Sequence, residues 1–66
     1  MKENEKSEYY LLSLEKVLKN IPAARRAEII LEVRNQIEQL KASGLMIENA
    51  LKQLGSVDQV ALRYGV

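Results

Sequence analysis

The chain contains neither cysteine nor histidine, and these two absences exclude several kinds of stabilisation and chemistry. Without cysteine no disulfide can form, and without either residue the usual zinc and copper sites are excluded. At 66 residues the chain makes one domain at most, and a domain of this size buries only roughly 60% of its unfolded surface. Helix packing, or association with another chain, must therefore supply its stability. No metal and no cofactor are expected.

A surplus of charge of one sign is also missing. Lys and Arg together number 10 and Asp and Glu 9, so the formal net charge is +1. A nucleic-acid-binding domain normally concentrates basic residues far beyond neutrality, and a segment that binds anionic lipid carries a polybasic cluster. The balance of charge therefore argues against nucleic acid or a lipid surface as the main partner.

Long apolar runs are absent as well. No stretch approaches the ~18–20 apolar residues that span a bilayer. The first ten residues, MKENEKSEYY, lack the apolar segment of a signal peptide. We therefore expect a soluble, cytoplasmic domain with no membrane insertion by this segment. Residues 1–6 are polar and are expected to be disordered.

The sequence does contain apolar residues at helical spacing. They recur every three or four positions from about Ser7 to Lys19, and again from Pro22 to about Ala42. Two shorter helices are expected at about residues 47–54 and 57–64. The predicted fold is all-α, a single domain over residues 1–66 in which two long antiparallel helices carry a short C-terminal helical hairpin. The residues expected in its core are Leu14, Leu18, Ile30, Ile37, Leu54 and Val60.

Proline and glycine are scarce, and they mark the boundaries between these helices. Pro22 separates the two long helices, because proline disfavours the α conformation in the preceding residue and suits a first helical turn. Gly44 is expected to end the second helix, and Gly55 to end the third with a positive φ. Ser56 and Gln59 then have the spacing of a capping box for the fourth helix.

Few residues offer catalytic chemistry. Glu28 and Glu32 share a helix face and could bind a hard cation or act as an acid–base pair, but a solvated face with nearby arginines is the simpler interpretation. The sequence supplies no histidine base and no glycine-rich phosphate loop. We therefore expect no enzymatic activity and assign no catalytic residues.

Basic residues support one alternative, a small helical DNA-binding module. Arg25 and Arg26 stand at the junction of the two long helices, and Arg63 lies in the last helix, so these three are the candidate nucleic-acid contacts. A recognition helix reads DNA through exposed basic or amide side chains near its N-terminus. Here Asp58 occupies that place, which makes DNA binding the less favoured function.

Three consecutive apolar residues, Leu45, Met46 and Ile47, stand where a helix start favours Ser, Thr, Asp or Asn. All three cannot point at one small core. Either Met46 packs as a staple and one neighbour is simply exposed, or the three form an apolar patch that docks a partner protein. Other residues off the core stripes would extend this candidate partner surface, namely Tyr9, Leu12 and Leu31.

The helix-packing and capping signals follow one another in a recognisable order. Tyr10-Leu11-x-x-Leu14-x-x-x-Leu18-x-x-Ile21-Pro22 precedes the long helix and Gly44, and Ala50-Leu51-x-x-Leu54-Gly55-Ser56-x-x-x-Val60-Ala61-x-x-Tyr64 follows. This order resembles the HTH-associated α-helical signalling (HAAS) domain of Gram-positive and related bacteria. The resemblance covers nearly the whole chain, and the matching residues all have structural roles.

The resemblance implies a cytosolic signalling module, usually the N-terminal part of a larger protein. Membrane helices or another signalling output commonly follow the module, which would place it at the inner face of the membrane through segments beyond residue 66. Such proteins are typically encoded beside PadR-like winged-helix transcriptional regulators, so the implied partner is such a regulator. The small size of the domain and the apolar residues 45–47 make a second copy of the chain the other expected partner. The sequence departs from the family pattern at three places: the family usually has a polar capping residue where Met46 stands, acidic residues near Ile47, and often proline where Val57 stands.

Overall fold

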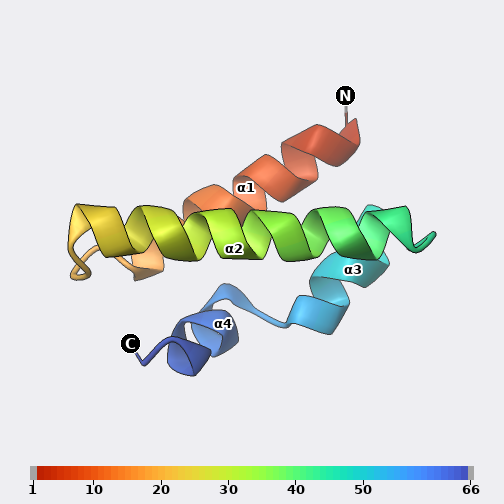
Figure 1. The fold of residues 1–66 in the computed structure, drawn as a ribbon. Coiled ribbons are helices and arrows are strands. Elements are labelled where there is room, and N and C mark those ends of the chain that lie inside the picture. Colours follow the sequence, from red (N-terminus) through yellow and green to blue (C-terminus); the bar gives the residue numbers. More distant parts are fainter. Residues whose placement is uncertain (1, 66) are drawn as a thin grey trace.

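The fold is all-α, as the sequence predicts. The computed structural model describes residues 2–65, with side chains from residue 5 onward, and Met1 and Val66 lie outside the described residues. Its helices are α1 (Lys2–Val17), α2 (Ala23–Ala42), α3 (Ile47–Leu54) and α4 (Val57–Arg63), with no strand among the described residues. Helix α1 runs antiparallel to α2 and crosses it obliquely, and α3 and α4 pack across the pair (Figure 1).

The helix boundaries differ from the predicted ones chiefly at the start of α1. The helix begins at Lys2 rather than near Ser7, so it extends into the segment for which disorder was expected. Within that segment the Nζ of Lys6 lies 2.5 Å from Oε2 of Glu48 at the start of α3. The partner of Lys6 is 42 residues away along the chain, so local sequence could not indicate this contact.

The turn between α1 and α2 is closed partly by a side chain. Pro22 takes the N-cap position of α2 with φ −53° and ψ 146°, and its ring offers no cap hydrogen bond. Arg26, one turn into α2, donates from Nη1 to the carbonyl oxygens of Ile21 at 3.1 Å and Lys19 at 3.4 Å. The guanidinium therefore satisfies carbonyls beyond the end of α1, where a cation also suits the helix dipole.

Gly44 ends α2, as predicted. Its φ is +103°, its N–H donates to the carbonyl of Lys41 at 3.0 Å, and the N–H of Leu45 donates to the carbonyl of Leu40 at 3.3 Å. This pair of bonds is the Schellman motif, which commonly needs glycine for its left-handed residue. The motif typically also has an apolar contact between the two residues joined by its longer-range bond, here Leu40 and Leu45. Leu45 therefore has a local structural role.

The turn between α3 and α4 also matches the prediction. Gly55 has φ +92°. In the next helix Gln59 donates its N–H to Oγ of Ser56 at 3.2 Å, and Ser56 donates its N–H to Oε1 of Gln59 at 3.0 Å. Both bonds of the capping box are therefore present, and they fix the direction in which α4 leaves the turn.

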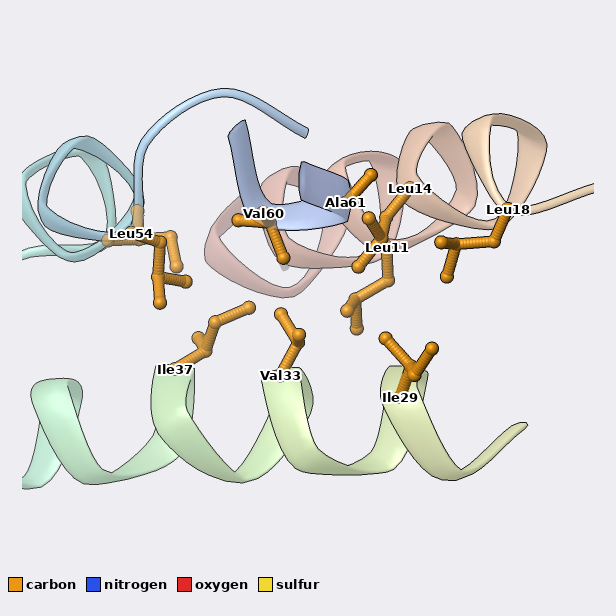
Figure 2. Close-up of a cluster of buried hydrophobic side chains, with 10 residues drawn as sticks. Leu11, Leu14, Leu18, Ile29, Val33, Ile37, Leu54, Val60 and Ala61 are labelled. Carbon is orange, nitrogen blue, oxygen red and sulfur yellow. The ribbon is translucent and has the colours of Figure 1, made fainter. Parts of the chain in front are cut away.

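The core is one apolar layer between α2 and the other helices. Figure 2 shows Ile29, Val33 and Ile37 on α2 pointing at residues from α1, α3 and α4. The burial predicted for five core residues is confirmed, but Ile30 is only partly buried, and its neighbour Ile29 takes the inner position. The reason is that α1 crosses α2 obliquely. The contact therefore follows a row of residues spaced four apart on α2, because such a row is inclined to the helix axis. The confirmed core residues are Leu14, Leu18, Ile37, Leu54 and Val60.

Candidate interaction surfaces

The predicted patch at the start of α3 is mostly absent from the surface. Ile47 is 2% exposed and belongs to the core, so its assignment to a partner surface is wrong. It begins the inward stripe of α3, which continues through Ala50 and Leu54. Leu45 is half-buried, and Met46 alone of the three is well exposed, at 64%. The patch therefore reduces to one methionine, which occupies the N-cap position without a side-chain cap bond.

Four large apolar side chains are exposed on the helices themselves. Tyr9 and Leu12 on α1, both included in the predicted partner surface, are 74% and 56% exposed. Leu31 on α2 is 58% exposed, and Leu62 on α4 is 69% exposed. Sequence reasoning did not single out Leu62, although its position between the inward residues Ala61 and Tyr64 gives it no place on that stripe. Contiguous apolar patches mark sites of protein contact, whereas single exposed apolar residues are common on any protein, so only neighbouring residues such as Tyr9 and Leu12 on α1 suggest a contact.

Tyr9 borders an open groove of about 700 Å³ that runs between α1 and the α3–α4 hairpin. Its walls are largely apolar, with Tyr10 on α1, Leu51 on α3 and Val57 at the start of α4. These three side chains also pack against the core, which holds the walls of the groove in place. The remaining lining residues are Glu5, Lys6, Ser13 and Ser56. Sequence reasoning did not find this groove, because it lies between helices that are distant along the chain.

A partly buried hydrogen bond ties the two sides of the groove together. The hydroxyl of Tyr10 donates to the carbonyl oxygen of Gly55 at 2.7 Å, which links α1 to the turn between α3 and α4. Burial raises the pKa of Tyr10, an effect that the positive charge of Arg63 partly opposes. The ionised tyrosine is therefore disfavoured in the folded state.

We expect Tyr10→Phe to lower the free energy of unfolding by about 1 kcal/mol at pH 8, because one partly buried hydrogen bond is lost. Since the folded pKa of Tyr10 is raised, its contribution is complete below the unfolded pKa of about 10 and is lost as the pH rises through the folded pKa. The difference between wild type and variant should therefore shrink above pH 10. Urea unfolding followed by circular dichroism at pH 8 and pH 10.5 measures it, and a difference that grows with pH would contradict the assignment.

Arg25, a candidate nucleic-acid contact, is engaged inside the domain. Its Nη1 lies 3.4 Å from Oε1 of Glu28 and 4.0 Å from Oε2 of Glu32. Its guanidinium lies 5.8 Å from the centre of the Tyr64 ring. The hydroxyl of Tyr64 in turn donates to Oε1 of Glu32 at 3.1 Å, and burial together with this carboxylate raises the pKa of Tyr64. These four residues join the end of α4 to the first half of α2.

The other two arginines also have neighbours within the domain. Arg26 holds the carbonyls of the α1–α2 turn, and Arg63 lies close enough to Tyr10 for its charge to influence the pKa of that hydroxyl. A DNA-binding face needs cations that are free to meet phosphates. Since Arg25 and Arg26 already have internal partners, the arrangement gives the DNA-binding alternative no support.

The fold and these surfaces define the class of the protein, a small helical domain with exposed apolar surface on several helices. No helix within residues 2–65 has the length and apolar character to cross a membrane. The HAAS family model matches residues 10–62, and the chain therefore belongs to the HAAS family. This membership makes it a signalling or regulatory module that acts through protein interaction. Comparison with curated proteins and with solved structures gave no match.

Proposed function

We propose that this chain is a non-catalytic docking domain that binds a PadR-like transcriptional regulator through the groove between α1 and the α3–α4 hairpin. The observation that carries the proposal is the groove itself, with about 700 Å³ of space and walls from three helices. Small-molecule sites are usually apolar hollows of about 300–1,000 Å³ with a few polar groups. The groove has this character.

The walls of the groove suit a helical segment of a partner. Tyr10, Leu51 and Val57 offer apolar contact along its length, and Lys6 and Ser56 offer polar contacts at its edges. An amphipathic helix binds in such a groove through apolar side chains spaced three and four residues apart. HAAS membership supports a PadR-like regulator as the source of this helix, because such regulators are typically encoded beside HAAS proteins.

The absence of catalysis is part of the proposal. The chain has no histidine or cysteine, and the carboxylates of Glu28 and Glu32 face Arg25 rather than the groove. A docking domain of this kind would transmit a signal by holding or releasing the regulator. Its place would be the cytoplasm, at the inner face of the membrane if the full protein is anchored there.

We expect Val57→Gln to weaken binding of a PadR-like regulator about tenfold, because one apolar wall of the groove becomes polar. Isothermal titration calorimetry with the purified regulator measures the Kd. The matched control is Leu62→Gln, the same kind of change on the same helix at a side chain that is 69% exposed and outside the groove. Absence of wild-type binding at ~100 µM, or equal loss in both variants, would overturn the proposal.

A further inference from the structure

The outer face of α1 carries a stripe of four residues, Glu5, Tyr9, Leu12 and Lys16, which we call the α1 stripe. Their spacing of four, three and four residues places them along one line of the helix, away from the buried Leu14. All four are exposed, and the two central residues are large and apolar. The α1 stripe therefore has the residue spacing of a coiled-coil seam and is largely exposed, although Glu5 and Tyr9 also border the groove.

The chemistry of the α1 stripe is self-complementary. It reads acid, apolar, apolar, base from the N-terminal to the C-terminal end. We propose that it is the interface of a homodimer, in which α1 packs antiparallel against α1 of a second copy about a two-fold axis. This arrangement places Glu5 opposite the second copy's Lys16 and Tyr9 opposite its Leu12, and the two-fold axis repeats each pair. Both apolar side chains are then covered, and both charges meet a charge of opposite sign.

Charge also decides the direction of the two helices. A parallel pair in register would place Glu5 against Glu5 and Lys16 against Lys16, which is repulsive at both ends. In the antiparallel pair the small Ser13 of one copy lies near the Tyr9 ring of the other, which leaves room for the ring. The register brings one pair of like charges to the same flank, Glu8 of one copy and Glu15 of the other, but Glu8 is already paired with Arg34 of its own chain.

The neighbouring helix adds apolar surface beside the α1 stripe. The Oε2 of Glu8 on α1 accepts a hydrogen bond from Nη1 of Arg34 on α2 at 2.7 Å, and this contact fixes how the two helices align. Leu12 lies one turn after Glu8 on α1, and Leu31 lies one turn before Arg34 on α2. Because the two helices are antiparallel, both leucines lie on the same side of this ion pair along the helix axes. Both leucines are more than half exposed.

The dimer is expected to be weak. The α1 stripe covers only three helical turns, so its contact is smaller than the ~1,600 Å² of a standard stable interface. We expect a Kd on the order of 100 µM, because the cost of association leaves little net free energy from so small an interface. In a chain as small as this one, such additional burial also raises the apparent stability as the protein concentration rises.

Sedimentation equilibrium of the whole chain between about 10 µM and 1 mM tests the dimer, and a charge swap tests its geometry. Glu5→Lys alone and Lys16→Glu alone should each raise the Kd about fivefold, because both symmetric ion pairs become repulsive. The double variant should return the Kd close to that of wild type. Glu5 and Lys16 are eleven residues apart on one helix, or about 16 Å, so this rescue requires two copies.

Engineered cysteines test the direction independently, since the natural chain has none. When Glu5→Cys and Lys16→Cys are mixed and oxidised, the disulfide should join the two different variants far more often than the one half expected from random pairing. A wild type that stays monomeric at 1 mM, a charge swap without rescue, or disulfides mainly between like variants would each overturn the antiparallel dimer. None of these measurements involves the regulator, so their failure is separate from failure of the proposed function.

Discussion

Leu14→Ala is expected to remove most or all of the stability of the domain. Leu14 is fully buried in the layer between α1 and α2, and truncation of such a leucine to alanine costs about 2–5 kcal/mol. Folded domains are stable by about 0.05–0.15 kcal/mol per residue, which gives roughly 3–10 kcal/mol for a chain of this length. Urea or thermal unfolding followed by circular dichroism at 222 nm should show a broad, early transition, or none.

The same helix provides the matched control for this experiment. Leu12→Ala makes the same chemical change two residues away, at a side chain that is 56% exposed. It should change the free energy of unfolding by no more than about 0.5 kcal/mol, as is usual for surface positions. The measurements belong at low micromolar concentration, where association through the α1 stripe contributes little. Equal losses at the two positions would show that the core is not where the structure places it.

Gly55→Val is expected to destabilise the domain by about 3 kcal/mol or more, because backbone strain and loss of a cap add together. Gly55 has φ +92° and ψ −175°, a conformation that is essentially restricted to glycine. A Cβ at this position would also collide with Oε1 of Gln59, the group that accepts the N–H of Ser56. Chemical denaturation measures the loss, and an essentially wild-type midpoint would contradict this account of the turn.

Gly44→Val separates the effect of backbone strain from the effect of losing the capping box. Gly44 also has a positive φ, but a Cβ there would meet nothing within 4 Å. We therefore expect a smaller loss than at Gly55, by at least about 1 kcal/mol, the usual value of a helix cap. Gln59→Ala supplies a further check. It should cost less in the Gly55→Val background than in wild type, since the capping box is already broken there.

These two sites also bear on the interaction surfaces. Leu14 belongs to the core against which the groove residues Tyr10, Leu51 and Val57 pack, and the carbonyl of Gly55 accepts the hydroxyl of Tyr10 across the groove. Destabilising either site should therefore also weaken docking, without any change in a contacting residue. Binding measurements on variants need a parallel measurement of folding for this reason.

Much of the fold was predictable because its signals are local. Apolar spacing indicated the four helices, Gly44 and Gly55 indicated two of the stops, and Ser56 with Gln59 indicated the capping box. The same signals, in the same order, gave the family resemblance that the HAAS match over residues 10–62 confirms. Each depends on residues within one or two turns of one another, and such interactions are largely independent of the rest of the molecule.

Predictions of which side chains are exposed were less successful. Ile29 rather than Ile30 faces the core, because the crossing angle of α1 and α2 selects the row of residues four apart. Ile47 was assigned to a partner surface but is buried, since the inward face of α3 begins at its first residue. A run of apolar residues shows that some must be exposed, but only the packing of neighbouring helices decides which.

The sequence by itself therefore determined an all-α domain, the positions of its turns, its family and the absence of cysteine and histidine. Only the tertiary structure brought Tyr10 to Gly55 and Arg25 to Tyr64, and only it created the groove and left the α1 stripe uncovered. The physical reason is the distance along the chain over which the two kinds of interaction act. Helix formation and capping act over a few residues, whereas a surface is what remains exposed after distant segments have packed together.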